Sequence, residues 1–385
     1  MFSDDLTEEL DRLRREHLFR RIEDRGPARS MQRPSRISLG GREYINFASN
    51  DYLGLSLHPA LGDAAKQAVD TYGFGAGASR LLAGGTEAHA ELERAIARFK
   101  GAERALLFNS GYTANLSAIP ALAREGDVLF SDELNHASII DGCRLSRARV
   151  VVYRHRDMDH LDALLKREKG RRSIIITDSV FSMDGDIAPL PELCSLCRTH
   201  GALLYIDDAH GTGVLGTGRG ALAHFGIPAA PWIVQMGTFS KAFGSFGAFI
   251  AAGSDCIEWL INTARGFIFS TALPAAAAAA SHAALSLVEE RADLVAALWR
   301  NREALVRGVQ EQGFDILQSE TPIVPVVVGD LAMTVQCAEA LRKRGVYAPA
   351  IRPPTVRVAR LRVTVTAAHE PADIDALLES LGRFR

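Results

Sequence analysis

The sequence has little of what marks secreted, membrane-spanning or nucleic-acid-binding proteins. Its 385 residues include only 5 cysteines and 3 tryptophans, and the formal net charge is −2. So small a net charge gives no field that would attract nucleic acid or an anionic membrane. The cysteines are odd in number and scattered, which argues against a disulfide framework and favours a reducing compartment. We therefore expect a cytoplasmic protein that binds neither nucleic acid nor a membrane.

Long hydrophobic runs are also missing. The most apolar long stretch, 271–288, is mostly alanine and contains His282, so we expect a packed helix there rather than a membrane span. Residues 2–5 are acidic where a signal peptide would be basic. Cys194 and Cys197 form a CxxC pair with no second pair to complete a zinc site, so we expect no metal.

The pattern from residue 87 to residue 252 is an alternation of helical periodicity and short apolar runs. Strands that are unbroken apolar runs, separated by helices, indicate a mostly parallel sheet covered on both faces. The predicted fold class is therefore α/β. The expected strands are 104–108, 128–130, 150–153, 173–177, 203–206, 232–234 and 248–252.

The two ends of the chain show different patterns. Residues 1–45 are predicted to form an N-terminal helix and arm, with a strand pair at 36–39 and 43–47. Residues 46–285 would form a large domain, and residues 286–385 a smaller α+β domain. In the smaller domain we expect a helix at 291–312, strands at 323–328, 347–351 and 360–364, a helix at 333–344 and a last helix near residue 371.

Chemically active residues follow several of these strands, at the edge where ligands bind to open α/β sheets. Lys241 comes shortly after the run 232–234, and lysine forms imines with carbonyl compounds such as pyridoxal phosphate (PLP). Thr238 and Ser240 beside it could donate hydrogen bonds to a phosphate. The alternative is a lysine on a solvated loop.

Asp207 and His210 follow the run 203–206. A carboxylate leaving a buried strand needs a cationic partner, and the protonated ring nitrogen of PLP is one. His210 could then reach the ring hydroxyl. A metal-binding D-x-x-H pair or an ordinary turn is the alternative.

Three further segments follow strands. Residues 109–115 open a helix whose N–H groups could hold a phosphate, although a plain helix cap explains the same residues. His136 lies near a helix start, where it could stack on a flat cofactor or serve as a solvated cap. Ser182 lies in an acidic loop, 178–186, that is also typical of turns.

Residues 73–79 have G-x-G-x-G spacing after a helix, which is not a dinucleotide fingerprint.

An acid–histidine pair followed about thirty residues later by a lysine is the order found in fold-type I PLP enzymes. The runs 207–213 and 238–241 resemble those of the α-oxoamine synthase family, and 46–55, 135–138 and 180–186 are further matches. The resemblance covers nearly the whole chain. It implies a fold-type I transferase with a mostly parallel sheet in a large domain, a smaller C-terminal α+β domain, PLP as cofactor and a homodimer.

The resemblance also implies roles for single residues. Lys241 would hold PLP covalently and move the Cα proton of the substrate, with Asp207 on the ring nitrogen and His210 on the ring oxygen. His136 would stack on the ring and contact the substrate. The other expected cofactor contacts are Gly111, Tyr112, Ser182, Thr238, Ser240 and, reaching the neighbouring subunit, Thr271. Asn50 and Arg362 would bind the substrate carboxylate, and Arg20 and Thr355 would be further substrate contacts.

Residues 351–356 and 364–370 resemble the branch of the family that serves biotin biosynthesis. This branch joins L-alanine to a pimeloyl thioester of CoA or acyl carrier protein. Residues 355–360 look shorter than is usual in the family, and Arg357 stands where proline is common, so the sequence departs from the pattern near the acyl substrate.

Two other functions are compatible with parts of this pattern. One is a synthase that uses glycine or serine with another acyl-CoA, for example of the 2-amino-3-ketobutyrate CoA ligase type. The other is a regulator that senses a ligand on a PLP fold without turnover. Regulators of that kind usually carry a DNA-binding unit, for which we expect the segment before Asn46 to be too short.

Overall fold

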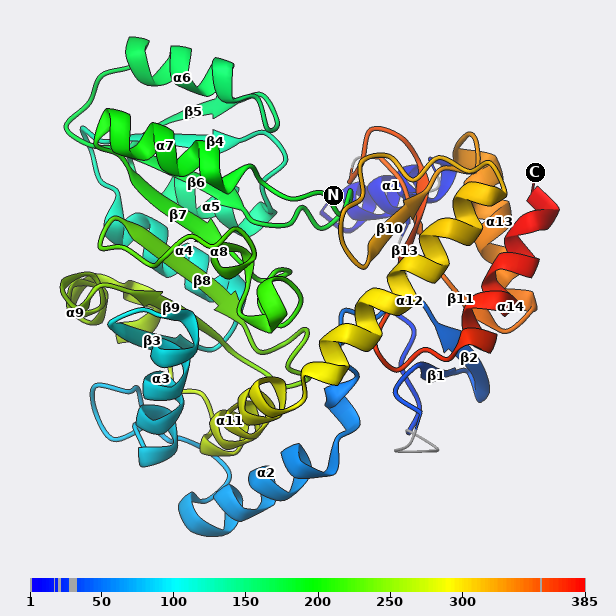
Figure 1. Cartoon of the computed structure of the whole chain (residues 1–385), viewed down its shortest axis with the longest axis horizontal. Helices are drawn as coiled ribbons and strands as arrows, with labels where there is room; N and C mark the ends of the chain where they lie inside the picture. The colour runs from blue at the N-terminus through cyan, green and yellow to red at the C-terminus, as the bar shows by residue number, and fades with distance from the viewer. Residues whose placement is uncertain (1, 17, 20–21, 28–32, 354, 385) are drawn as a thin grey trace.

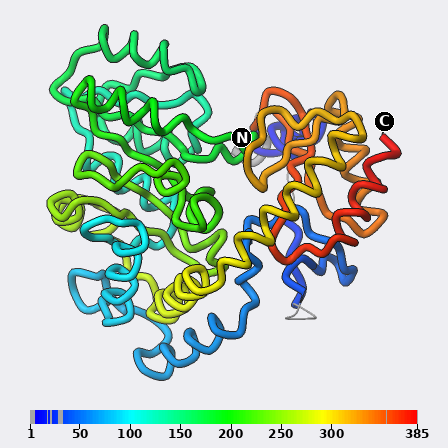
Figure 2. The backbone as a smooth tube through the Cα atoms, in the orientation of Figure 1, coloured from blue at the N-terminus to red at the C-terminus, as the bar shows by residue number. Residues whose placement is uncertain are grey.

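The computed structural model of the protein describes residues 2–16, 18–19, 22–27, 33–353 and 355–384. These residues form two lobes, and helix α12 (Ala292–Glu311) runs from one toward the other (Figures 1 and 2). The larger lobe contains a seven-stranded sheet, and two three-stranded sheets complete the fold. Within the described ranges, no helix is both long enough and apolar enough to cross a membrane.

The seven-stranded sheet has the strand order β3-β9-β8-β7-β6-β4-β5. Strand β9 runs antiparallel to both of its neighbours, and the other neighbouring pairs are parallel. The strands are β3 (Arg104–Phe108), β4 (Val128–Asp132), β5 (Arg149–Tyr153), β6 (Ser173–Asp178), β7 (Leu203–Asp207), β8 (Ile233–Thr238) and β9 (Ala248–Ala252). The predicted mostly parallel α/β sheet is confirmed.

Both faces of this sheet are buried because its strands are apolar on both sides, except at the edge strand β5, where Val150 and Val152 are exposed. Ile174 and Ile176 of β6 pack into one core, and Ile175 between them packs into the other, as the alternation of side chains along a strand requires. The helices of the large lobe supply the other half of each core. They are α2 (Pro59–Tyr72), α3 (Glu87–Lys100), α4 (Gly111–Leu122), α5 (Ala137–Leu145), α6 (Met158–Arg167), α7 (Leu190–His200), α8 (Ala221–His224), α9 (Ser254–Thr263), α10 (Arg265–Ile268) and α11 (Ala275–Glu290).

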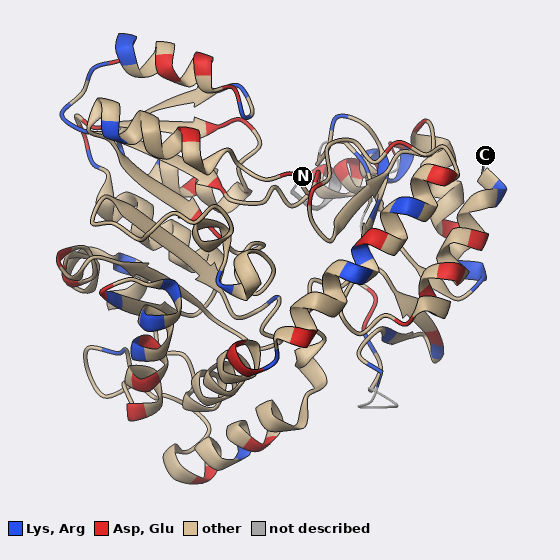
Figure 3. Cartoon of the chain, in the orientation of Figure 1, with Lys and Arg blue, Asp and Glu red and all other residues tan. Residues whose placement is uncertain are grey.

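The smaller lobe is built on antiparallel pairing. Strand β13 (Arg360–Thr364) lies between β10 (Ile323–Val326) and β12 (Ala350–Ile351). Helices α12, α13 (Leu331–Lys343) and α14 (Pro371–Leu381) pack with this sheet (Figure 1). Basic and acidic residues are interspersed along α12 (Figure 3). Helix α1 (Phe2–Arg15) and the short 3-10 helices η1 (Leu55–Leu57), η2 (Gly216–Gly218) and η3 (Gly382–Phe384) complete the described elements.

The third sheet joins distant parts of the sequence. Strands β1 (Arg36–Leu39) and β2 (Arg42–Asn46) form a hairpin, and β2 pairs in parallel with β11 (Val346–Tyr347). The prediction of a single strand at 347–351 is wrong, because this segment forms two strands, β11 and β12, which belong to different sheets. Pro349 lies between them, and a proline has no N–H with which to continue a strand ladder. The domain boundaries at residues 46 and 286 stay predictions.

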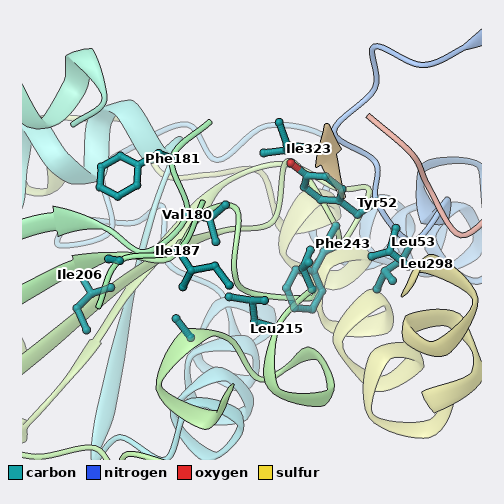
Figure 4. Packing of buried hydrophobic residues seen from close by; sticks show 14 of the residues in the cluster. Tyr52, Leu53, Val180, Phe181, Ile187, Ile206, Leu215, Phe243, Leu298 and Ile323 are labelled. Carbon is teal, nitrogen blue, oxygen red and sulfur yellow. The ribbon is translucent and has the colours of Figure 1, made fainter. Parts of the chain in front are cut away.

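One hydrophobic core continues from the seven-stranded sheet into the smaller lobe. It includes Ile206 of β7, Phe243 after β8, Leu298 of α12 and Ile323 of β10 (Figure 4). Tyr52, which precedes η1, belongs to the same cluster. The carboxyl ends of the parallel strands therefore lie close to where the two lobes share their core.

Candidate active site

Four polar residues from the carboxyl ends of the strands act on one another electrostatically. Asp178 and Asp207 are the last residues of β6 and β7 and are paired in register. Lys241 follows β8 by three residues, and His136 caps α5 after β4. Burial of the Lys241 ammonium lowers its pKa to about 8, although Asp207 and Asp178 oppose that shift. The structure thus brings Lys241, Asp207 and His136 together at this edge of the sheet; the roles predicted for them stay predictions.

Asp207 is held firmly in a buried position. Its side chain accepts hydrogen bonds from Asn115 Nδ2 at 2.7 Å and from the backbone N–H of Ala209 at 3.0 Å. Burial raises the pKa of Asp207, and Lys241 and Asn115 oppose the rise. Burial also raises the pKa of Asp178 well above its usual range, and the neighbouring Asp207 adds to that effect.

Asn115, on α4, is a site residue to which the sequence analysis gave no role. It is fully buried and, besides its bond to Asp207, donates to Ser138 Oγ at 2.8 Å and accepts from Tyr205 Oη at 2.8 Å. Ser138 Oγ in turn lies 2.8 Å from His136 Nδ1. One amide therefore orients both Asp207 and, through Ser138, His136. The feature of the sequence that could have indicated this role is a polar residue, Asn115, at a position of α4 where an apolar residue is expected.

The surroundings of His136 and His210 favour the neutral form of both imidazoles. Burial lowers the pKa of His136, and Asp207 opposes that shift. Burial lowers the pKa of His210 well below its ordinary value, and the charges of Lys241 and Arg362 add to the effect. His136 is also fixed through its backbone N–H, which donates to Asp178 Oδ2 at 2.7 Å.

Arg362 extends the site into the smaller lobe. It lies in β13, is buried, and donates through Nε to the carbonyl oxygen of Ser182 at 2.6 Å and through Nη2 to Asn50 Oδ1 at 3.1 Å. Its Nη1 donates to Thr364 Oγ1 at 2.9 Å. Its charge contributes to the lowered pKa of Lys241. Asn50, Ser182 and Arg362 are thus brought together beside Lys241.

The start of α4 lies beside the end of β8. A Cβ placed on Gly111 would stand 3.9 Å from Thr238 Cβ, so the first turn of α4 faces the buried threonine. Thr238 Oγ1 donates to the Gly247 carbonyl at 2.8 Å and accepts from the Ser240 N–H at 3.1 Å. The first N–H groups of a helix have no partner within the helix, so this corner can bind an anion.

The remaining predicted residues lie further out. Tyr112 is 43% exposed, and its hydroxyl donates to Asp141 Oδ2. Ser240, Thr271 and Thr355 are exposed, and Arg357 pairs with Glu133 at 3.3 Å on the surface. Arg20 lies outside the described residues.

The donor set fits PLP. Two buried carboxyl groups stand near a single lysine, and a protonated ring nitrogen would supply further positive charge opposite Asp207. Lys241 is an amine that loses its proton near pH 8 and can therefore bond to a carbonyl carbon. The start of α4 with Thr238 offers a place for a phosphate.

Comparisons with known proteins agree with this geometry. The family model for class I and II aminotransferases matches residues 42–381. The 8-amino-7-oxononanoate synthase of Geobacter sulfurreducens is 50% identical over 382 residues, which cover 98% of this chain and 96% of that protein. A structure of serine palmitoyltransferase with PLP is 30% identical, has a TM-score of 0.91, and is matched over 99% of this chain and 96% of that one. The structure of 8-amino-7-oxononanoate synthase from Francisella tularensis is 30% identical with a TM-score of 0.77, over 88% of this chain and 97% of that one.

The family model matches residues 42–381, and a relative that is 50% identical is matched over nearly its full length. These two findings show the family. The chain belongs to the class I and II aminotransferase family of fold-type I PLP enzymes and, within it, to the 8-amino-7-oxononanoate synthases among the α-oxoamine synthases.

Proposed function

We propose that the protein condenses L-alanine with a pimeloyl thioester and releases CO2, so that 8-amino-7-oxononanoate and the free thiol carrier are formed. The observation that carries this proposal is the 50% identity, over 98% of the chain, with a relative of that name. When bound, PLP supplies an electron-withdrawing ring that acidifies the Cα–H bond of the amino acid and takes up its electrons. The rest of the chemistry belongs to the chain.

Lys241 is the residue to which we assign proton transfer. A pKa of about 8 leaves much of its amine neutral in mildly alkaline solution, and a neutral amine is both a nucleophile and a base. Lys241 Nζ would therefore hold PLP covalently and later accept and return the Cα proton. Asp207 would hold the ring nitrogen, His210 the ring oxygen and His136 the face of the ring.

The phosphate and the substrate carboxylate would bind at opposite ends of the site. Gly111, Tyr112 and Thr238 would bind the phosphate side, with Ser182 and Ser240 close by. Arg362 and Asn50 would bind the carboxylate of L-alanine, because a guanidinium offers a carboxylate two parallel N–H donors. The bonds from Arg362 to Ser182 and Asn50 fix the plane of the guanidinium in advance. Thr355 and Arg20 would be further substrate contacts.

We also propose that the protein is a homodimer, with Thr271 reaching the phosphate in the neighbouring subunit. Thr271 pairs with Ser79 in an isolated bridge, and large apolar side chains are exposed in the two segments that carry these residues, which supports the proposal because exposed apolar surface marks association sites. These side chains are Phe74, Leu82 and Phe269. A solution mass of one chain, measured by light scattering, would contradict the proposal.

The five free cysteines support a reducing cytoplasm as the compartment.

The assay supplies PLP and L-alanine with pimeloyl-CoA or with pimeloyl acyl carrier protein, and detects the product by mass spectrometry and the freed thiol by absorbance. We expect L-alanine to give the highest kcat/KM. A higher value with glycine or L-serine would support the second candidate, a synthase for another amino acid, which the TM-score of 0.91 with serine palmitoyltransferase makes worth testing.

Two lysine variants complete this test. Lys241→Ala should lose turnover while the protein stays folded. Lys66→Ala removes an exposed lysine of α2 whose only described ion pair is with Asp63 on the surface, and should keep full activity. Full activity of Lys241→Ala would contradict the assignment.

A further inference from the structure

Tyr52 contacts the site although the sequence analysis gave it no role. Its hydroxyl oxygen lies 2.7 Å from His210 Nδ1, and the two rings meet edge to face with centroids 6.1 Å apart. Tyr52 is only 1% exposed and belongs to the continuous hydrophobic core (Figure 4). Its backbone is fixed as well, because its N–H donates to the Asn50 carbonyl and its carbonyl accepts from the Ala367 N–H. This tyrosine is therefore held in place independently of His210.

The direction of the hydrogen bond follows from what surrounds the hydroxyl. Burial raises the pKa of Tyr52 to about 12, although Arg362 opposes the rise, so the hydroxyl keeps its proton. Arg362 has only donors and cannot accept that proton. Among the described residues, His210 Nδ1 is the acceptor recorded for it. The Tyr52 O–H therefore donates to His210 Nδ1.

This bond decides where His210 carries its proton. Burial and the charge of Lys241 hold the pKa of His210 well below its usual range, so the imidazole is neutral and has one N–H. A nitrogen that accepts a hydrogen bond carries no proton, which leaves the proton on Nε2. We propose that Tyr52 is a positioning residue that fixes His210 as its Nε2–H tautomer and so makes Nε2 a hydrogen-bond donor.

The opposite arrangement is disfavoured. If His210 Nδ1–H donated to Tyr52, the tyrosine proton would be buried without an acceptor. That cost favours the Nε2–H tautomer over the Nδ1–H tautomer by at least about fivefold. The use of the Nε2 donor, to hold the ring oxygen of PLP, rests on the proposed function. The tautomer itself does not.

The test is nuclear magnetic resonance of the full-length protein labelled with 15N at histidine, before and after loading with PLP. Long-range 1H–15N spectra distinguish the two tautomers, and the His210 signals are identified by their loss in His210→Gln. We expect the unsubstituted protein to show the Nε2–H tautomer. Tyr52→Phe should show a mixture of both tautomers and bind PLP about tenfold more weakly, since one buried donor is lost.

The matched control is Tyr153→Phe, which removes the hydroxyl of another fully buried tyrosine, at the end of β5. It should leave the His210 signals and the PLP affinity unchanged. If Tyr52 had only a packing role, Tyr52→Phe would lower the melting temperature without changing the tautomer of His210.

The inference is overturned if the unsubstituted protein shows His210 Nδ1–H, a result that needs no variant to fold. It is also overturned if Tyr52→Phe leaves the Nε2–H form fully populated. Failure of the proposed function would be seen separately, as an Nε2–H histidine in a protein that turns over none of the amino acids.

Discussion

Replacing Lys100 with methionine should destabilise the protein strongly, although the hydrogen bonds that Lys100 donates to described side chains and carbonyls reach none of the predicted site residues. Lys100 ends α3, and its side chain is 1% exposed. Its Nζ donates to Asp208 Oδ2 at 2.8 Å, to the Arg219 carbonyl at 2.8 Å and to Thr212 Oγ1 at 3.2 Å. Methionine keeps most of the apolar stem and removes the charge, so Asp208 would remain buried without its counter-ion.

The expected magnitude follows from the burial of both partners. Breaking a buried ion pair by removing one partner costs about 3–5 kcal/mol. For one unfolding transition of all 385 residues, at about 2.1 cal/mol/K per residue, the entropy of unfolding is about 0.8 kcal/mol/K. The melting temperature should therefore fall by about 4–6 °C. Differential scanning calorimetry on the PLP-loaded protein measures it.

Two further variants separate the ion pair from the loss of any lysine. Lys66→Met removes a lysine whose side chain is 78% exposed and should change the melting temperature by less than about 1 °C. Lys100→Met combined with Asp208→Asn should recover part of the loss, because a neutral amide needs no counter-ion. A melting temperature for Lys100→Met within about 1 °C of the unsubstituted protein would refute the reasoning.

Two other predictions concern pH and the cofactor. His155 lies between Asp132 and Asp186 at 2.9 and 2.7 Å, and these hydrogen bonds outweigh the effect of burial and raise its pKa to about 9. The stability that protonated His155 contributes is therefore fully present below pH 6.5 and is lost as the pH rises through 9. His155→Gln should lower the free energy of unfolding by up to about 3 kcal/mol at pH 6 and should have little effect on it at pH 10. A loss that is equal at both pH values, in denaturant titrations, would contradict this. Asn115→Ala removes the side-chain donor to Asp207 and should weaken PLP binding about tenfold, as followed by absorbance; an unchanged affinity would show that Asp207 needs no such support.

Those site residues that follow the strands could be predicted from the sequence for a topological reason. Asp207, Lys241 and His136 each follow an apolar run, and parallel strands place their carboxyl ends at one edge of a sheet. Arg362 could be anticipated only through the family resemblance, because its distance from Lys241 depends on how the two lobes pack. Asn115 could not be placed, because its three hydrogen bonds depend on side-chain directions that periodicity does not encode.

The adjacent residues Asp207 and Asp208 show why one motif can serve both stability and chemistry. Neighbouring residues at the end of a strand point to opposite sides, so the two carboxyl groups meet different surroundings. Asp208 forms an ion pair with Lys100 and accepts from the hydroxyls of Ser179 and Thr212, so its partners all come from the chain itself. Asp207 has as its nearby cation Lys241, whose amine is poised to lose its proton near pH 8. A lysine that has lost its proton no longer balances a buried carboxylate, and burial then favours the neutral acid; a protonated cofactor ring opposite Asp207 would supply the charge that keeps it ionised.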